Sequence, residues 1–361
     1  MKRKGLVIPD VLVYHQGCLR IIDQRFLPLR VIYRKLSSVP AVVEAIRELQ
    51  IRGAPWIGVA AAYGMAVVAE RSGDQELIAG LTKAAEMLMV ARPTAVNLGW
   101  AVSRIMEVVA HTKGVSPAVL RRRVLKEAKA IEADECRRSR AIARYGAKLV
   151  PENGTVLTIC NTGMLAGPGL GTALGVIYQA YQEGKNPLVY VCETRPLLQG
   201  ARLTAWELKR AGINFRLIVD SASASVIEHC DLVIVGADRI AANGDTANKI
   251  GTKMLALLAK TASKPFYVAA PSSTFDLKIR NGKEIPIEIR SGDEIARIGP
   301  CRLAPAGITV YNPAFDVTPA RYIAGFITEK GVVRPPYRNR LARLLYSVVT
   351  KTRSITTGGR T

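Results

Sequence analysis

A thiol and a carboxyl group follow two apolar segments that are typical of buried β-strands. Cys160 ends the segment Thr155–Cys160, and Asp238 comes shortly after the segment Leu232–Gly236. Ligands of an open parallel sheet bind beyond the carboxyl ends of its strands, so we expect both groups at the same edge. A thiol and a carboxyl group placed there can move protons to and from a small substrate. Cys160 and Asp238 are therefore the candidate catalytic residues.

A structural role is the competing interpretation of each group. A free cysteine commonly packs as a small buried side chain, and an aspartate in a turn commonly pairs with a neighbour such as Arg239. The turn after Cys160 offers backbone N–H groups to a thiolate. The apolar segment before Asp238 predicts that desolvation raises the pKa of its carboxyl group. Cys192 ends another predicted strand, and we expect it only to pack.

Three further segments offer positive charge and N–H groups to an anion. Arg52 precedes Gly53 just before a segment of small residues, which predicts a buried helix over Trp56–Ala69. Its guanidinium suits an anion at the mouth of that helix. Arg92 lies in a second turn of this kind. Asn248–Lys249 is predicted to begin a helix, whose first N–H groups suit a phosphate or sugar hydroxyls.

The glycine-rich turn after Cys160 gives an alternative, a nicotinamide-dependent dehydrogenase. Gly169 and Gly171 have the spacing that begins a dinucleotide fingerprint. The next glycine, Gly175, lies one position too far along the chain, and Pro168 interrupts the loop. The spacing therefore favours an enzyme without a nicotinamide cofactor.

Composition sets limits on the class of protein. The sequence has 361 residues with 49% hydrophobic content, enough for two domains with buried cores. The 6 cysteines are scattered without a C-x-x-C pair, and there are only 3 histidines, so we expect reduced thiols, no metal and no cofactor. No signal peptide or bilayer-spanning apolar segment is evident, which indicates a cytoplasmic protein without membrane contact.

The formal net charge of +22 raises the alternative of a nucleic-acid-binding protein. The basic residues gather in a few clusters without an interleaved stripe of aromatic residues for base stacking. These clusters are Met1–Lys4, Arg121–Arg123, Arg137–Arg144 and the tail from Arg334. Their distribution argues against nucleic acid as the partner and indicates a positive field that attracts an anionic substrate.

Hydrophobic periodicity predicts an α/β fold in two parts. Residues 1–120 predict a largely helical domain, with amphipathic stretches such as Ala41–Leu49 and Gln75–Ala91, and residues 121–150 predict a connecting helix. Over 151–345, apolar segments alternate with helical ones and predict a doubly wound parallel sheet. Residues 346–361 are expected to form a basic flexible tail. Besides the two strands above, the expected strands are Leu188–Cys192, Phe215–Val219, Phe266–Ala270 and Ile308–Tyr311, and the expected helices include Leu197–Ala211 and Asn248–Lys260.

Taken in order, several segments between Cys18 and Pro335 resemble the methylthioribose-1-phosphate isomerases of methionine salvage. The matching segments are Asp23–Gln24, Arg52–Pro55, Arg92–Asn97, Cys160–Asn161, Gly171–Ile177, Glu193–Leu208, Gly236–Asp245, Asn248–Thr252 and Asn312–Pro319. The chain departs from the family pattern at Tyr145, Ile159, Thr162 and Cys192, which flank the candidate pair without removing it.

The resemblance implies a fold, an activity and a set of site residues. The fold is a small helical domain joined to a Rossmann-like domain, the protein a homodimer, and the substrate a furanose 1-phosphate. Cys160 and Asp238 become the catalytic pair, with Asp238 as a general acid that opens the ring. Either Cys160 carries a proton from C2 to C1, or a hydride shifts between these carbons. The implied substrate-binding residues are Arg52, Gly53, Ala54, Arg92, Gln199, Asn248 and Lys249.

Relatives of the same fold leave alternatives open. These are isomerases of 5-deoxyribose 1-phosphate or ribose 1,5-bisphosphate, and the non-enzymatic regulatory subunits of translation initiation factor 2B. Retention of both Cys160 and Asp238 favours an enzyme. The cations of the motifs suffice for one phosphate, so we expect an apolar group at C5 in a pocket formed by Trp56–Val59.

Overall fold

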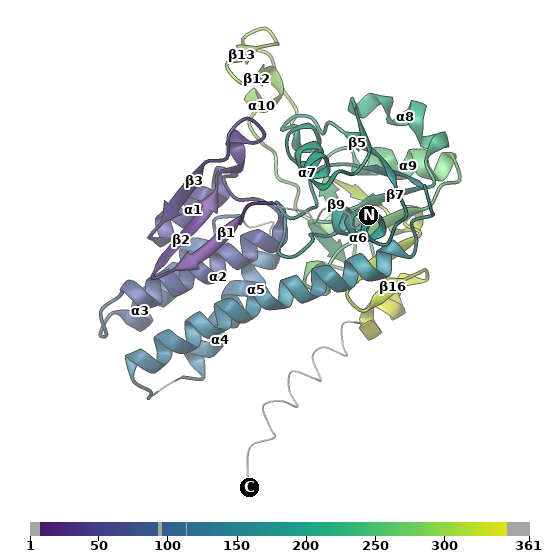
Figure 1. Cartoon of the computed structure of the whole chain (residues 1–361). Coiled ribbons are helices and arrows are strands. Elements are labelled where there is room, and N and C mark those ends of the chain that lie inside the picture. The colour runs from purple at the N-terminus through teal and green to yellow at the C-terminus, as the bar shows by residue number, and fades with distance from the viewer. Residues whose placement is uncertain (1–7, 93–95, 113, 345–361) are drawn as a thin grey trace.

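A computed structural model describes residues 8–92, 96–112 and 114–344. Figure 1 shows a helical N-terminal part and a C-terminal part built around a larger sheet, with the long helix α5 (Pro117–Ala147) extending from one to the other. The predicted connecting helix is thus present. The predicted tail, residues 346–361, lies outside the described residues. No helix of the described residues has the length and apolar character needed to span a bilayer.

The N-terminal part surrounds one apolar helix. Helix α2 (Ala54–Arg71) is buried on nearly all sides, because other helices and a small sheet pack around it. Its alanines and glycines permit this close approach. The neighbouring helices are α1 (Val39–Arg47), α3 (Leu77–Met89), α4 (Val96–Ala110) and α5. The sequence did not predict the three-stranded antiparallel sheet of β1 (Leu12–His15), β2 (Cys18–Ile22) and β3 (Tyr33–Leu36).

The predicted α/β sheet is confirmed in the C-terminal part as a seven-stranded sheet in the order β16-β15-β10-β7-β4-β5-β6. All its strands are parallel except β16, which pairs antiparallel with β15. The strands are β4 (Thr155–Thr158), β5 (Leu188–Cys192), β6 (Phe215–Ile218), β7 (Leu232–Val235), β10 (Phe266–Ala269), β15 (Gly325–Thr328) and β16 (Gly331–Val333). The strand expected at Ile308–Tyr311 is wrong, because this segment is an exposed loop and β15 takes that place in the sheet.

Helices cover both faces of this sheet. On β4, Val156 shares a core cluster with residues of α6, whereas the adjacent Leu157 shares one with residues of α9. Successive side chains of a strand point to opposite faces, so the two clusters are the two sides of a doubly wound sheet. The helices of this part are α6 (Ala173–Gln182), α7 (Ala205–Ala211, after a π-helical turn Gly200–Thr204), α8 (Ser223–Val226) and α9 (Thr252–Thr261).

A second, four-stranded sheet follows β7 and corrects one prediction. Asn248 and Lys249 end a strand instead of beginning a helix, and α9 starts after Gly251, whose φ is +99°. Asp316 pairs with Asn248 in this sheet. The order is β11-β8-β9-β14, with β8 (Arg239–Ala241), β9 (Thr246–Lys249), β11 (Phe275–Asp276) and β14 (Phe315–Thr318). Between β11 and β14 the chain forms an arm, at the top of Figure 1, with α10 (Asp293–Ala296), β12 (Arg297–Ile298) and β13 (Cys301–Arg302).

Candidate active site

Cys160 lies in a tight turn directly beyond β4. Its φ of +66° is unfavourable for a residue with a side chain, and the backbone is fixed from both sides. The N–H of Cys160 donates to Thr194 Oγ1 (2.9 Å), and its carbonyl accepts from Thr204 Oγ1 (2.6 Å). Both threonines follow β5. Contacts from the segment that follows the neighbouring strand therefore fix the backbone that carries the thiol.

A buried carboxylate holds the rest of this turn. Glu207 of α7 accepts from Asn161 Nδ2 (2.7 Å), from the N–H groups of Met164 (2.8 Å) and Leu165 (3.3 Å), and from the Tyr178 hydroxyl (2.9 Å). Burial raises the pKa of the Glu207 carboxyl group, and these hydrogen bonds oppose that rise. We did not single out Glu207 in the sequence. The sequence feature that could have identified it is an acidic residue on the inner face of a predicted helix.

Arg52 reaches this turn from the N-terminal part of the chain. Its Nη1 donates to Asn161 Oδ1 (2.8 Å), and its Nη2 donates to Cys160 Sγ (3.4 Å). The adjacent Gly53 has φ +84°, and a Cβ on it would lie 2.1 Å from the carbonyl oxygen of Ala166. Only glycine permits such an approach. The two parts of the chain therefore meet at the candidate thiol.

Asp238 lies beyond β7, as predicted. Its N–H donates to the carbonyl of Ala247 (2.9 Å), which fixes the start of the second sheet beneath the site. Its side chain lies deep in the protein and keeps only partial exposure. Burial raises the pKa of the carboxyl group, and the nearby charges of Lys249, Arg92 and Arg52 oppose this. The predicted direction of the pKa shift is confirmed.

Lys249 is held inside the protein close to both candidate groups. Its Nζ donates to the carbonyl of Ala314 (3.1 Å) and lies 5.1 Å from the centre of the Phe315 ring. Burial lowers the pKa of this ammonium, and the Cys160 and Asp238 charges oppose that change. A strand, and not a helix N-terminus, therefore positions this cation.

Two adjoining hollows meet at the candidate pair. We call them the cationic hollow and the apolar hollow. Arg52, Gly53, Cys160 and Asp238 line both. The cationic hollow also contains Arg92, Gln199, Lys249 and Arg290, and the apolar hollow also contains Ala54, Pro55, Ile142, Ala166, Pro168, Pro271 and Asn248. Every residue predicted for the site thus lies on one of the two hollows, and the roles assigned to them stay predictions.

The apolar pocket expected at Trp56–Val59 lies elsewhere. Ile57 and Val59 are buried in the N-terminal core, and Trp56 Nε1 donates to the carbonyl of Met164 (2.7 Å). These residues belong to helix α2, which is enclosed by its neighbours. The apolar hollow is lined instead by Ala54 and Pro55, the two residues directly before Trp56.

Arg290 is a cation of the site that the sequence analysis missed. It comes from the arm before β14, and its Nη1 donates to Glu288 Oε1 (2.7 Å). The other carboxylate oxygen of Glu288 lies 3.5 Å from Arg92 Nη2. Among the described residues, the buried Arg92 Nε and Gln199 Oε1 have no hydrogen-bond partner. Unpaired buried polar atoms are costly, so these two atoms suit a polar ligand.

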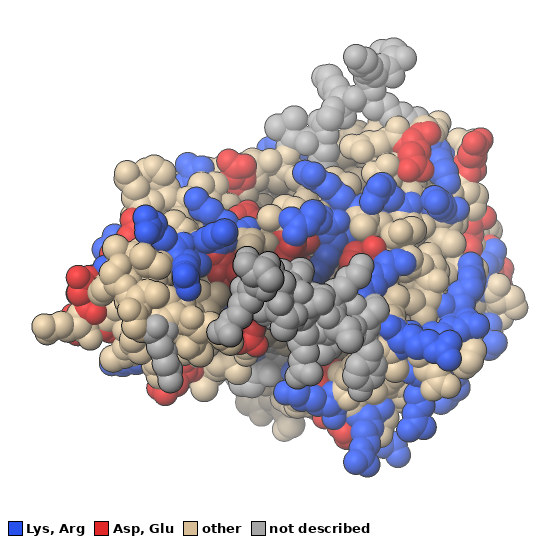
Figure 2. All heavy atoms as spheres, turned by 90° about the horizontal axis from the view of Figure 1, so that it is seen from below, with Lys and Arg blue, Asp and Glu red and all other residues tan. Residues whose placement is uncertain are grey.

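Cys192 packs in the core, as expected. Its sulfur lies 3.2 Å from Ser223 Oγ, and burial raises the pKa of its thiol to about 12. Within the described residues, no three side chains of His, Cys, Asp or Glu gather as metal ligands would. On the face seen in Figure 2, Lys and Arg side chains are spread widely, with Asp and Glu between them.

Comparison with known proteins places the chain in a family. Residues 50–335 match the model of the initiation factor 2 subunit family. The chain belongs to this family. A methylthioribose-1-phosphate isomerase of Carboxydothermus hydrogenoformans is 48% identical over 93% of this chain and 98% of its own length. A protein of Moorella thermoacetica named 5-deoxyribose 1-phosphate isomerase is 48% identical over 92% of this chain and 96% of its own length.

Solved structures include both classes of relative. The crystal structure of 5-methylthioribose 1-phosphate isomerase from Pyrococcus horikoshii superposes with a TM-score of 0.87 at 44% identity, covering 94% of this chain and 96% of that one. A structure described as translation initiation factor eIF-2B, subunit delta, from A. fulgidus has a TM-score of 0.82 at 42% identity, covering 93% and 99%. The predicted resemblance is confirmed.

The hydrogen bonds of Glu207 generate a prediction about stability. Glu207→Ala leaves several buried donors unpaired and should lower the free energy of unfolding by about 3 kcal/mol or more. Denaturant unfolding of both proteins measures the difference. The exposed Glu228 offers a matched control, and Glu228→Ala should change stability by less than about 0.5 kcal/mol. Equal stability of the two variants would contradict the role given to Glu207.

Proposed function

We propose that this protein is an isomerase that converts 5-methylthioribose 1-phosphate to 5-methylthioribulose 1-phosphate. The observation that carries the proposal is the position of Cys160 and Asp238 at the border between the cationic and the apolar hollow. The substrate has the same division. A phosphate lies at one end, an apolar methylthio group lies at the other, and the reacting carbons C1 and C2 lie between them.

The phosphate binds in the cationic hollow. Arg92, Lys249 and Gln199 line this hollow and not the apolar one, and Arg52 lines both. Guanidinium groups can bind phosphate oxygens in pairs, whereas an ammonium acts as a point charge. The unpaired Arg92 Nε and the buried ammonium group of Lys249 support a site prepared for an oxyanion. C1 is then next to the pair, and C5 extends into the apolar hollow.

Asp238 opens the furanose ring. The phosphate on C1 prevents spontaneous opening, so the ring oxygen needs a proton when its bond to C1 breaks. Burial raises the pKa of the Asp238 carboxyl group, and this shift favours the protonated form that a general acid needs. When the ketone forms at C2, the hydroxyl on C2 releases a proton, which returns to the Asp238 carboxylate. The acid is therefore regenerated in each turnover.

Cys160 carries the hydrogen from C2 to C1. The thiolate removes the C2 proton to give an enol-type intermediate, and the thiol then returns that proton to C1. The sulfur is held by the turn beyond β4 and by the Arg52 guanidinium, which limits its movement between these two steps. No proton or electron is gained or lost overall, as isomerisation requires.

Two alternatives follow from named relatives. A bare 5-deoxy sugar fits the same hollows, since it differs only in the size of the group at C5. A regulatory subunit of an initiation factor has no need of a thiol and a carboxyl group at the border of two hollows. The pair therefore favours the enzyme.

We further propose that the protein acts in methionine salvage in the cytoplasm as a homodimer. The edge strand β6 supports self-association, because Leu217 in this strand and Val219 directly after it are 47% and 54% exposed. An exposed sheet edge with apolar side chains is a common surface for pairing.

The roles of the pair predict the effect of removing either group. Cys160→Ala and Asp238→Asn should each lower kcat by on the order of 10²-fold or more, because each removes a proton carrier from the reaction. Steady-state assays with 5-methylthioribose 1-phosphate measure this, with circular dichroism to verify the fold. Cys192→Ala is the control and should remain active. Turnover close to wild type in either site variant would refute its assigned role.

The apolar hollow predicts a ranking of substrates. An added methylthio group should increase kcat/KM over a 5-deoxy sugar by one or two orders of magnitude, since each methylene-sized group contributes roughly 1–3 kcal/mol in an apolar pocket. The measurement compares the methylthio, deoxy and 1,5-bisphosphate sugars in one buffer. A higher kcat/KM for the deoxy sugar than for the methylthio sugar would make the deoxy sugar the assigned substrate. A higher kcat/KM for the bisphosphate than for the methylthio sugar would contradict an apolar group at C5.

A further inference from the structure

A buried carboxylate lies on the wall of the apolar hollow. Glu135 belongs to the long helix α5, and its side chain is only 3% exposed. It lines the apolar hollow beside Ser139, Ile142, Pro271 and Thr274, and it does not line the cationic hollow. No step of the proposed reaction uses this carboxylate. Its position next to apolar side chains therefore needs another explanation.

Only one oxygen of Glu135 is hydrogen bonded within the described residues. Oε1 accepts from Arg138 Nη1 (2.8 Å) and from Ser273 Oγ (3.3 Å). Oε2 has no partner there and is not among the fully enclosed unpaired atoms. The rest of the Glu135 side chain is buried. We therefore infer that Oε2 faces the apolar hollow, which Glu135 lines.

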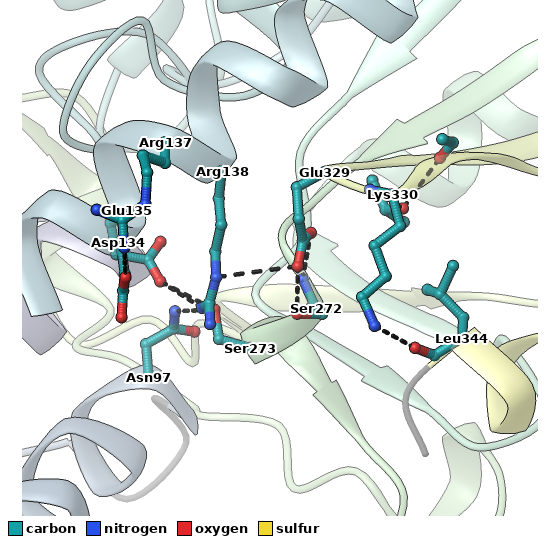
Figure 3. Close-up of polar contacts among 12 residues, drawn as sticks. Asn97, Asp134, Glu135, Arg137, Arg138, Ser272, Ser273, Glu329, Lys330 and Leu344 are labelled. Carbon is teal, nitrogen blue, oxygen red and sulfur yellow. Dashed lines mark hydrogen bonds and ion pairs between the residues drawn. The ribbon is translucent and has the colours of Figure 1, made fainter. Parts of the chain in front are cut away.

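The cation beside Glu135 is shared with a second carboxylate. Figure 3 shows Arg138 between Glu135 and Glu329, and Arg138 Nε lies 3.9 Å from Glu329 Oε1. Glu329 is itself fixed by the N–H of Ser272 (2.9 Å) and by the Ser272 hydroxyl. Two carboxyl groups thus share one guanidinium. Burial raises the pKa of the Glu135 carboxyl group, and the charge and hydrogen bond of Arg138 oppose this rise and favour the carboxylate form.

The same wall offers few donors to an incoming anion. The Ser139 hydroxyl already donates to the carbonyl of Gly171 and accepts from the N–H of Leu170, both at 2.8 Å. The Arg138 guanidinium is directed to carboxylates. Among the described residues of this wall, the Thr274 hydroxyl is left without a partner. One hydroxyl cannot balance a dianion beside a buried carboxylate.

We propose that Glu135 is a specificity-determining residue that excludes substrates with a second phosphate at C5. The inference rests on the proposed function, which places the C1 phosphate in the cationic hollow and directs C5 to this wall. A neutral methylthio or methyl group meets Ile142 and Pro271 without penalty. A 5-phosphate would lie against Glu135 in a site shielded from water, where repulsion between like charges is strong.

Glu135→Gln tests the proposal with little change in shape. The amide keeps an oxygen for Arg138 and Ser273 and removes the charge. We expect the ratio of kcat/KM for ribose 1,5-bisphosphate to that for 5-methylthioribose 1-phosphate to rise at least about tenfold. Where bisphosphate turnover is too slow, its inhibition constant against the methylthio substrate should fall by the same factor. Glu135→Ala should shift the ratio in the same direction.

Glu329→Gln is the matched control. This substitution also removes a carboxylate charge next to the Arg138 guanidinium, but Glu329 does not line the apolar hollow. We expect its ratio to remain within about threefold of wild type. A shift in Glu329→Gln equal to that in Glu135→Gln, or an unchanged ratio in folded Glu135→Gln, would overturn the inference. The wild-type assay tests the proposed function separately, because absence of turnover with every neutral 5-substituted sugar 1-phosphate would refute that function alone.

Discussion

The turn beyond β4 depends on one buried carboxylate. Without Glu207, the N–H groups of Met164 and Leu165 would lose their acceptor, and the amide of Asn161 would keep only its 3.2 Å hydrogen bond to Thr204 Oγ1. With it, the turn is rigid enough to hold Cys160 at a positive φ and to present Asn161 to Arg52. The contact between the two parts of the chain rests on this turn. The borders of both hollows therefore depend on a residue that touches neither the thiol nor the substrate.

The sequence predicted the parts of the site that follow from the sheet itself. Continuous apolar strands separated by helices indicate a parallel sheet, and such a sheet places the ends of β4 and β7 side by side. Cys160 and Asp238 were found in this way. The raised pKa of Asp238 followed from the apolar strand before it. Arg52, Arg92 and Asn248–Lys249 were anion-binding candidates from their local sequence, whereas Gly53, Ala54 and Gln199 came only from the resemblance of whole segments to a family. All of them line one or both hollows.

The features of the site that the sequence did not predict depend on tertiary packing. Lys249 is followed by a helix, so local pattern assigned it to that helix, whereas pairing with Phe315 makes it part of a strand. The apolar residues of Trp56–Val59 are compatible with a pocket or with a buried core, and only the packing of neighbouring elements around them shows that they belong to the core. Arg290 and Glu135 lie far from the motifs in sequence and reach the hollows only through an arm and a long helix. Their roles depend on which charges surround them, and no local pattern reports this.

The central claim is that one sugar phosphate occupies both hollows in a single orientation. A crystal structure of Cys160→Ala with bound 5-methylthioribose 1-phosphate tests this directly, since the variant should bind without turnover. We predict the phosphate within hydrogen-bond distance of Arg92 and Lys249, C2 facing residue 160, and the methylthio group against Ile142. A sugar bound in the opposite direction, with its phosphate in the apolar hollow beside Glu135, would contradict the account.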